Sequence, residues 1–198
     1  MKHLVIVAHP RSDSLTMRLA QAYVQELSTL GHQHTLHDLY RMDFDPILTS
    51  AEIAQLPHAT PPDVVQAQQD ILAVDVVTVI YPLWWLSMPA ILKGYVDRVF
   101  ARGFAYEAVK GQVRGLLGGR QCVLLTLSGA PLPVLAGSGQ WNALTMLQDR
   151  HVFHAVGFEL LEHLHFDHIE KGLATAVFNE YLERIRHFVR EQFGRTAH

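Results

Sequence analysis

The sequence lacks the cysteine pairs and the basic blocks that mark extracellular and nucleic-acid-binding proteins. Its one cysteine, Cys122, has no partner in the chain for a disulfide, which favours a reducing compartment, and we expect the cytoplasm. Lys and Arg number 16 against 19 Asp and Glu, for a net charge of -3. This mild acidity, without any basic cluster, argues against a nucleic acid or an anionic membrane surface as partner.

Long hydrophobic runs are also missing. One stretch without a charge, residues 76–92, has 17 residues and contains Pro82 and Pro89, so it barely reaches the length of a membrane span. The apolar run near the N-terminus, residues 2–8, is too short for the core of a signal peptide. We therefore expect a soluble protein with no membrane span.

Two familiar nucleotide motifs are absent as well. Neither G-x-x-x-x-G-K-[ST] nor G-x-G-x-x-G occurs, which argues against a P-loop and a Rossmann dinucleotide turn. The 198 residues are 49% hydrophobic, enough to build a core and to exclude intrinsic disorder. We expect one domain over residues 1–198.

Apolar, β-branched runs alternate with segments of helical periodicity along the whole chain. The expected strands are residues 2–8, 33–39, 75–81, 121–127 and 160–166, and the expected helices are 14–30, 63–73, 90–101, 138–156 and 174–193. Residues 44–62 are predicted to be irregular, with a possible short helix over 51–56. This alternation predicts an α/β three-layer sandwich with a parallel sheet, and five strands favour the flavodoxin-like order 2-1-3-4-5.

In such a sheet the ligand lies outside the carboxyl ends of the strands, which points to three loops. The first, residues 9–16, opens a helix and carries Ser14 and Thr16, so its free amides and hydroxyls suit a phosphate. A simple N-cap role for Ser14 remains an alternative. The third, residues 128–130, is a small glycine-containing turn that lets the backbone approach a ligand.

The second loop, residues 82–89, places Trp84 and Trp85 between two prolines at the end of a buried strand. Prolines stiffen the loop, so its aromatic rings and amides form a rigid wall along which a flat isoalloxazine could lie. The alternatives are a hydrophobic plug over the sheet end and a dimer contact.

Together these loops resemble those of the flavin-dependent NAD(P)H:quinone oxidoreductases of the DT-diaphorase type, which have a flavodoxin-like fold. Residues 81–106, YPLWWLSMPAILKGYVDRVFARGFAY, look like the family's P-L-x-W-x-x-x-P-A-x-L-K-G-x-x-D-R-V-F…G-F-A-Y signature. Residues 38–46 are similar to its D-L-Y-x-M-x-F-x-P stretch. His9 and residues 14–16 match H-x-x-x-x-S-[FL]-N, with Thr in place of Asn. The resemblance covers residues 1–166.

The resemblance implies a set of flavin-binding residues. The flavin phosphates would contact His9, Ser14, Leu15 and Thr16, the isoalloxazine would lie along Pro82, Leu83, Trp84, Trp85 and Leu86, and its pyrimidine side would meet Ser128, Gly129 and Ala130. Trp85 and Tyr106 are the candidate catalytic residues, with Tyr106 reaching the ring from the partner subunit of a homodimer. FAD is favoured over FMN by the 38–46 stretch, and NAD(P)H is the implied reductant.

Two departures from the family concern proton transfer. The family's relay Tyr and His would fall in residues 131–141, which contain neither, and Ala108 replaces a second active-site Tyr. The resemblance nevertheless predicts ping-pong hydride transfer from NAD(P)H through flavin N5 to quinones or related electrophiles. The alternatives are a flavodoxin-type electron carrier and an ancillary subunit of a potassium-efflux system.

The sequence is rich in histidine, with 13 residues. His163, His165 and His168 resemble a metal cluster, but no Cys or well-spaced carboxylate completes it, so we predict no metal and solvated histidines at a strand end. The histidines of the second strand, His32, His34 and His37, are expected to face solvent.

The positions of five other side chains suggest a role or a contact. His151 and His154 are the candidates to replace the missing proton donor. Lys93 and Asp97 are spaced for an ion pair on a helix surface. Cys122 lies in an apolar strand and is predicted to be an inert core residue.

Overall fold

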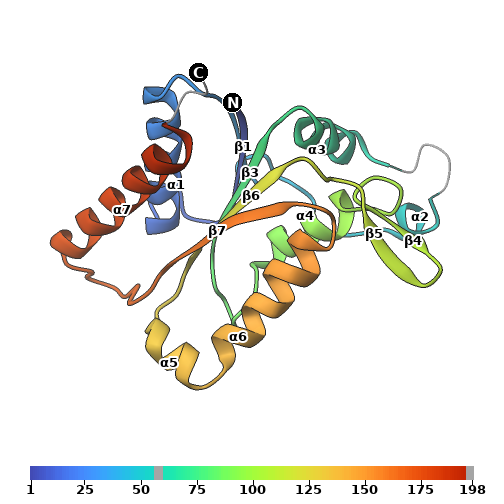
Figure 1. Cartoon of the computed structure of the whole chain (residues 1–198). Coiled ribbons are helices and arrows are strands. Elements are labelled where there is room, and N and C mark those ends of the chain that lie inside the picture. The colour runs from blue at the N-terminus through green and yellow to red at the C-terminus, as the bar shows by residue number, and fades with distance from the viewer. Residues whose placement is uncertain (56–59, 195–198) are drawn as a thin grey trace.

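A computed structural model describes residues 1–55 and 60–194 of the chain (Figure 1). Its centre is a sheet of five parallel strands in the order β2-β1-β3-β6-β7. The strands are β1 (Lys2–Val7), β2 (Gln33–Asp38), β3 (Val76–Pro82), β6 (Gln121–Leu127) and β7 (Glu159–Phe166). Numbered among themselves, these strands have the order 2-1-3-4-5, so the predicted flavodoxin-like α/β fold is confirmed.

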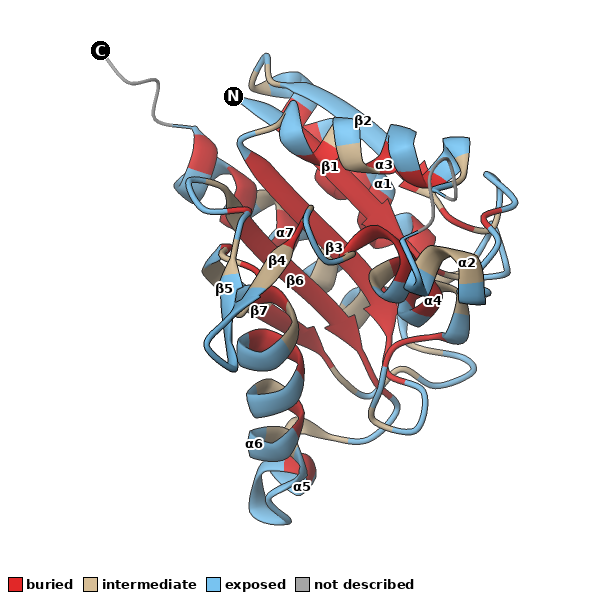
Figure 2. Ribbon diagram, turned by 90° about the vertical axis from the view of Figure 1, so that its right-hand side faces the viewer, coloured by how far each residue is buried: buried red, intermediate tan, exposed pale blue. Residues whose placement is uncertain are grey.

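Helices cover both faces of the sheet, because its central strands are apolar on both sides. Within β1, Leu4 and Ile6 point into one core, and Val5 and Val7 point into the other. One face is covered by α1 (Leu15–Thr29) and α7 (Thr175–Phe193). The opposite face is covered by α3 (Pro62–Leu72), α4 (Ala90–Val99) and the segment that follows β6. Figure 2 shows the buried strands between these two layers.

A short helix that was not predicted, α5 (Leu132–Gly137), follows the third loop. The helix predicted over residues 138–156 comes next as α6 (Gln140–Thr145) and, without a break, a π-helical run, η1 (Met146–His154), whose π-helical form was not predicted. Gly139 separates the first two helices with a left-handed φ of 78°, a conformation that glycine adopts at little cost. This broken path carries the segment from the carboxyl edge of the sheet back across its face.

An antiparallel hairpin of β4 (Tyr106–Val109) and β5 (Gln112–Gly115) was not predicted. Its two-residue turn is Lys110–Gly111, with φ of 51° and 79°, as the tight turns of hairpins require. The short helix expected over 51–56 is α2 (Ser50–Ile53), and residue 56 lies outside the described residues.

The prediction that the second strand's histidines face solvent is wrong for His37. Its ring is buried against α3, and its Nε2 lies 2.9 Å from a carboxylate oxygen of Asp70. His34 is exposed as predicted, whereas His32 is half-buried with its Nε2 3.0 Å from the carbonyl oxygen of Phe193. The end of β2 at His37 is therefore part of the protein interior, whereas residues 33–36 are exposed.

Two other predictions are confirmed. Cys122 is fully buried, and burial raises the pKa of its thiol, so it is an inert core residue. Lys93 and Asp97 form an ion pair on the surface of α4.

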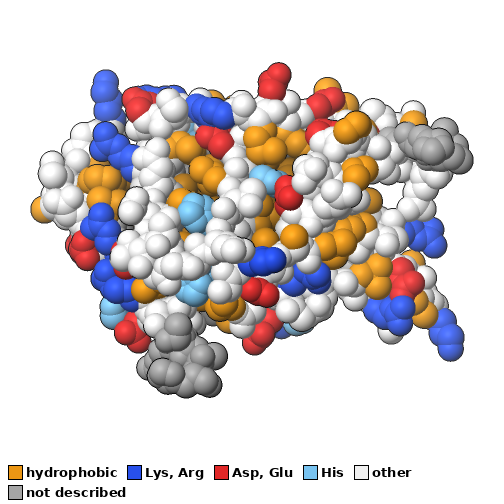
Figure 3. All heavy atoms as spheres, turned by 90° about the horizontal axis from the view of Figure 1, so that it is seen from above, with side chains coloured by type: hydrophobic (Ala, Val, Ile, Leu, Met, Phe, Trp, Pro, Cys, Tyr) orange, Lys and Arg blue, Asp and Glu red, His pale blue; other side chains and the backbone are white. Residues whose placement is uncertain are grey.

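Among residues 1–55 and 60–194, no helix combines the length and the apolar character needed to cross a bilayer. Figure 3 shows one face of the molecule, on which basic and acidic side chains are interspersed.

Candidate active site

The loop between β1 and α1 leads into the first turn of a helix and carries the groups of a candidate anion site. Ser14 is the N-cap of α1, and its Oγ accepts a hydrogen bond of 3.2 Å from the amide of Met17. The amides of Leu15 and Thr16 belong to the first turn, where a helix offers them no acceptor of its own. The Thr16 side chain is itself buried, so this residue would contact a ligand through its backbone.

Arg41 fixes the path of this loop from a distant part of the chain. Its Nη1 donates to the carbonyl oxygen of His9 at 2.7 Å, and its Nη2 donates to that of Pro10 at 2.6 Å. Asp38 lies 3.4 Å from the same guanidinium. The loop is therefore held against the end of β2 before any ligand binds.

His9 is arranged to donate a hydrogen bond outward. Burial lowers the pKa of its imidazole, which keeps the ring neutral at pH 7. Its Nδ1 lies 3.1 Å from the Arg11 amide, which can only donate, and 3.3 Å from the Arg11 carbonyl oxygen; the shorter contact makes Nδ1 the acceptor and leaves the ring hydrogen on Nε2. The ring also lies beside Trp84, with centroids 5.9 Å apart, so the first and second loops meet here.

A cavity of about 690 Å³ extends from this loop toward the start of α7. It is lined by His9, Arg11, Asp13, Ser14, Leu15, Arg18, Ile169, Glu170, Gly172, Leu173, Thr175, Phe178 and Asn179. Arg18 brings a positive charge to it, one turn after Ser14, and lies over the ring of Phe178 at 5.4 Å. Arg18 was missed at the sequence level, where its spacing of four residues from Ser14 was the only signal.

The second loop ends in a strained tight turn. The backbones of Trp84 and Ser87 exchange hydrogen bonds of 3.1 Å and 3.0 Å, so Trp85 and Leu86 occupy the corner. Both have a left-handed φ, 53° and 57°, although neither is glycine. The Trp85 side chain is 101% exposed, and Gln148 of η1 donates to the carbonyl oxygen of Leu86 at 3.3 Å.

Replacing Trp85 with glycine is expected to stabilise the flavin-free protein. The exposed indole contributes little packing, whereas glycine removes about 1 kcal/mol of left-handed strain, worth about 2–4 °C in the melting temperature. Circular dichroism melting measures the shift. Trp84→Gly is the control, because Trp84 has no left-handed φ and packs beside His9; it should lower the melting temperature. A lower melting temperature for Trp85→Gly would show that the turn is not strained.

The third loop adjoins the second and is supported by a polar network. The Leu83 amide donates to the Leu127 carbonyl at 2.7 Å, which joins the ends of β3 and β6. Gly129 and Ala130 are exposed, and the Ser128 hydroxyl donates to the Ala130 carbonyl at 2.7 Å. Pro82 and Leu83 are buried, so their side chains are not available to a ligand.

The prediction that His163 and His165 are solvated is wrong. Their side chains lie on the same face of the sheet as Thr126 of the neighbouring strand β6, and Trp141 packs against both rings. Both hydrogen-bond to Thr126 Oγ1 at 2.8 Å. His165 also lies 3.0 Å from Ser128 Oγ. His168 is exposed beside Asp167. Within the described residues, no group of three His, Cys, Asp or Glu is placed to hold a metal ion.

Tyr106 is not brought to the three loops within this chain. It begins β4 and lines a separate cavity with Arg98, Phe104 and their neighbours. His151 and His154 are exposed on η1. The three loops themselves lie at the carboxyl ends of β1, β3 and β6, which are adjacent in the sheet.

Comparison with known proteins identifies the family. The model of the family with a flavodoxin-like fold matches residues 1–189. An uncharacterized NAD(P)H oxidoreductase of Haemophilus influenzae is 35% identical over 164 residues, covering 82% of this chain and 81% of the relative. The ribosyldihydronicotinamide dehydrogenase [quinone] of Mus musculus is 30% identical, covering 81% of this chain and 78% of the relative. The chain belongs to the flavodoxin-like NAD(P)H:quinone oxidoreductase family.

A solved structure of this family has nearly the same architecture over its whole length. The NAD(P)H:quinone oxidoreductase of Methanothermobacter marburgensis superposes with a TM-score of 0.86 at 28% identity, covering 100% of this chain and 99% of that one. The family membership predicted from residues 81–106 and the first loop is thus confirmed.

The donor groups of the first two loops fit the flavin that the family resemblance implies. A phosphate needs hydrogen-bond donors, which His9 Nε2 and the first-turn amides of α1 supply, and the positive charge of Arg18 lies one turn further along the same cavity. A flat ring needs a rigid wall, which the turn at residues 84–87 provides.

Proposed function

We propose that this chain is a flavin-dependent NAD(P)H dehydrogenase that reduces quinones or related electrophiles. The observation that carries the proposal is the meeting of an anion-binding helix start with a strained aromatic turn, joined by the His9–Trp84 contact of 5.9 Å. The helix start suits the phosphate of a flavin, and the aromatic turn suits its ring. The two adjoin at the carboxyl edge of the sheet, where ligands bind in this fold class.

Each loop has a distinct task in holding the cofactor. The flavin phosphate would accept hydrogen bonds from His9 Nε2, the Ser14 hydroxyl and the amides of Leu15 and Thr16. The ring would lie along residues 82–86, with its pyrimidine end toward residues 128–130. When bound, the flavin supplies the two-electron chemistry, since it takes hydride from NAD(P)H and reduces the acceptor. The protein supplies the stacking, the hydrogen bonds and the exclusion of water.

The cavity beside the first loop favours FAD over FMN. It continues past Ser14 to the start of α7, where a second phosphate and an adenosine would find Arg18 and Phe178. FMN has no group to reach these residues. Flavin released by heating the purified protein should therefore run as FAD on chromatography.

Arg18→Met is expected to weaken FAD binding about tenfold, the equivalent of one charge-assisted contact of about 1.4 kcal/mol, and to leave FMN affinity within about twofold. Isothermal titration of the flavin-free protein with each flavin measures both constants. Arg11→Met is the control, because the Arg11 guanidinium is exposed and already paired with Asp13 at 2.9 Å. Equal losses for the two flavins would contradict the assignment of the cavity.

A second copy of the chain would complete the site. Trp85 is fully exposed at the flavin wall, and Val134, Met146 and Leu147 expose apolar side chains on α5 and η1. Tyr106, remote from the loops of its own chain, would then serve the ring of a partner. Sedimentation equilibrium should show a dimer.

The activity is tested by NAD(P)H oxidation with a benzoquinone in flavin-loaded protein. Turnover together with flavin absorbance near about 450 nm supports the proposal. Flavin binding without turnover would favour an electron carrier or a regulatory subunit, and failure to bind either flavin would remove the basis of all three.

A further inference from the structure

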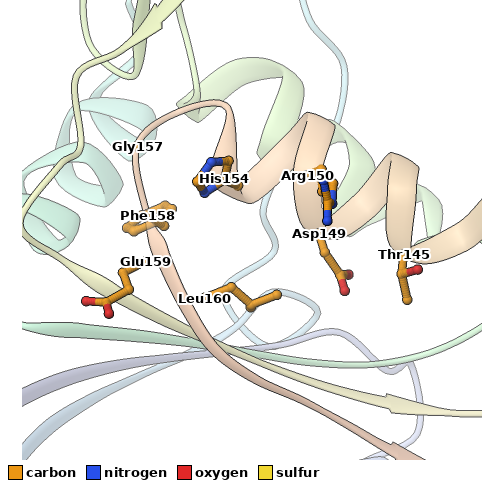
Figure 4. Close-up of a pocket in the computed structure, with 8 residues that line it drawn as sticks. All are labelled: Thr145, Asp149, Arg150, His154, Gly157, Phe158, Glu159 and Leu160. Carbon is orange, nitrogen blue, oxygen red and sulfur yellow. The ribbon is translucent and has the colours of Figure 1, made fainter. Parts of the chain in front are cut away.

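The π-helical run η1 turns two consecutive polar side chains toward the sheet. Gln148 and Asp149 are both buried, although neighbours in a regular helix point about 100° apart. Asp149 points from η1 into a cavity of about 780 Å³ beside β7 (Figure 4), and its Oδ1 lies 3.0 Å from His163 Nδ1. Gln148 instead reaches the end of β3 and the second loop. Because π-helical turns are rare and recur at functional sites, the contacts of Gln148 point to a task at the candidate site.

The carboxamide of Gln148 lies between Tyr81 and Leu86 in a single orientation. Its Nε2 lies 3.3 Å from the Leu86 carbonyl oxygen, and its Oε1 accepts from the Tyr81 hydroxyl. A carbonyl oxygen only accepts, so the amide nitrogen faces Leu86 and the amide oxygen faces Tyr81. Burial raises the pKa of the Tyr81 phenol, which therefore keeps the hydrogen that it donates. Both ends of the carboxamide are thus fixed by groups that keep one role.

The peptide unit between Leu86 and Ser87 is held at both of its ends. Its N–H, which belongs to Ser87, donates to the Trp84 carbonyl oxygen at 3.0 Å. Its carbonyl, which belongs to Leu86, accepts from Gln148. A peptide unit is planar, so these two bonds together fix its orientation and restrict the backbone of Leu86. Gln148 therefore acts on the conformation of the turn at residues 84–87.

The turn needs this support because its own residues do not favour its shape. A positive φ at both corner positions is the mark of a type I′ turn, for which Asn-Gly is the preferred pair. Here the corner residues are Trp85 and Leu86, both bulky, with φ of 53° and 57°. The Trp85 indole is fully exposed, so packing of this side chain does not hold the corner. The bond from Gln148 to the Leu86 carbonyl is a restraint from outside the loop that does.

A corner held in this shape has two hydrogen-bond donors to offer. Within residues 1–55 and 60–194, the amides of Trp85 and Leu86 donate to no protein group. The direction of each amide depends on the backbone angles of the corner, so one fixed shape gives both a fixed direction. Donors that are in place before a ligand arrives lose less freedom when it binds, and affinity rises accordingly.

We propose that Gln148 is the positioning residue of the second loop. Its carboxamide holds residues 84–87 in their left-handed shape, and the amides of Trp85 and Leu86 are thereby arranged for the flavin ring before it binds. The inference rests on the proposed function, which supplies the flavin. Gln148 itself acts through the Leu86 carbonyl and has no contact with the ring in this assignment.

The shape of the turn is tested by NMR of the flavin-free protein. A left-handed φ brings the amide hydrogen close to the Hα of its own residue, so Leu86 should show a strong NOE between the two in the wild type. Gln148→Met keeps an unbranched side chain and removes the carboxamide, and this NOE should weaken toward that of an ordinary loop residue. Gln68→Met is the matched control, because Gln68 of α3 donates a similar bond, 3.1 Å long, to the Val99 carbonyl outside the three loops. It should leave the Leu86 NOE unchanged.

Two outcomes of this measurement overturn the proposal. One is a weak Leu86 NOE in the wild type, a result that requires no variant to fold. The other is a Leu86 NOE that stays equally strong in Gln148→Met, or in Gln148→Leu if the methionine variant does not fold.

Flavin affinity then separates positioning from simple packing. Isothermal titration should give Gln148→Met an affinity about fivefold weaker than that of the wild type, the equivalent of one neutral hydrogen bond. Leu86→Gly gives the corner the residue that a type I′ turn prefers, so in this background the same Gln148→Met should cost less than about twofold. Gln68→Met should bind flavin as the wild type does. Equal losses in the two backgrounds would mean that Gln148 only fills space, which overturns the proposal.

The failure of this inference can be told apart from the failure of the proposed function. A wild type that binds neither FAD nor FMN overturns the proposed function and, with it, the arrangement of the amides for a flavin. A wild type that binds flavin, with the same affinity in Gln148→Met, overturns the role of Gln148 alone.

Discussion

Gly94→Ala should destabilise the protein by about 3 kcal/mol, although alanine is the better helix former. A Cβ at Gly94 in α4 would lie 2.2 Å from the carbonyl oxygen of Pro46 and 2.5 Å from its Cα. These are backbone atoms of a segment that crosses the helix, so relief requires moving one element away from the other. Equilibrium unfolding in urea measures the loss as a lower midpoint with an unchanged slope.

Gly137→Ala is the matched control and should have the opposite sign. Gly137 ends α5, and nothing lies within 4 Å of the Cβ that alanine would add. The substitution removes backbone freedom from the unfolded chain and should raise stability by up to about 1 kcal/mol. If Gly94→Ala were as stable as the wild type, the segment at Pro46 would not be held against α4.

The close contact at Gly94 explains part of the signature that carried the family resemblance. Within residues 81–106, Gly94 admits the Pro46 segment and Arg98 bonds to residues around it. These positions hold α2 and the preceding loop against α4, at a distance from the three loops. A long motif can thus identify a family while only its first residues, 82–86, line the candidate site.

The strands were predictable because burial on both faces leaves a continuous apolar run. Each of the five sheet strands lies within one or two residues of its predicted range, and five strands alternating with helices favoured the order that the structure has. The hairpin of β4 and β5 was not predicted, because its strands are four residues long and half exposed. Lys110–Gly111 was the available signal for its turn.

The π-helical run shows a different limit. Residues 146–154 have the composition of an ordinary helix, and periodicity alone does not reveal an altered hydrogen-bond pattern. Its consequence for the site is large, since Gln148 bonds the Leu86 carbonyl and Asp149 meets His163. The sequence alone does not predict that these two side chains lie opposite β3 and β7.

The three loops of the candidate site could be located from the sequence, whereas the residues that support them could not. The carboxyl ends of adjacent strands converge in any parallel sheet, and this placed residues 9–16, 82–89 and 128–130 together. Arg41 reaches the first loop from more than thirty residues away. The spacing of His163 and His165 predicted that they share one face of a strand. It did not predict that both side chains bond to Thr126 of the neighbouring strand.

Arg98→Met should cost about 3–5 kcal/mol, the largest loss expected for a single substitution in this protein. The guanidinium is buried, and it donates to Glu52 Oε1 at 2.9 Å, to the Asp45 carbonyl at 2.6 Å and to Asp63 Oδ2 at 3.2 Å. Methionine keeps the length of the stem and leaves the buried Glu52 carboxylate without its counter-charge. Urea unfolding measures the loss. Lys93→Met, on the exposed pair of the same helix, is the control and should cost less than about 1 kcal/mol.

The cost of Arg98→Met should itself depend on pH, which separates the charge from the packing of the side chain. Burial alone would raise the pKa of Glu52, but hydrogen bonds from Thr49 and Arg98 outweigh it and hold this pKa below its ordinary value. A depressed pKa contributes stability at neutral pH that is lost as the pH falls through it. The difference between wild type and Arg98→Met should therefore be full at pH 7 and narrow below about pH 4. A difference that stays constant over this range would mean that Arg98 acts through its bond to the Asp45 carbonyl and its contact with Phe44, 5.2 Å from the guanidinium, and not through Glu52.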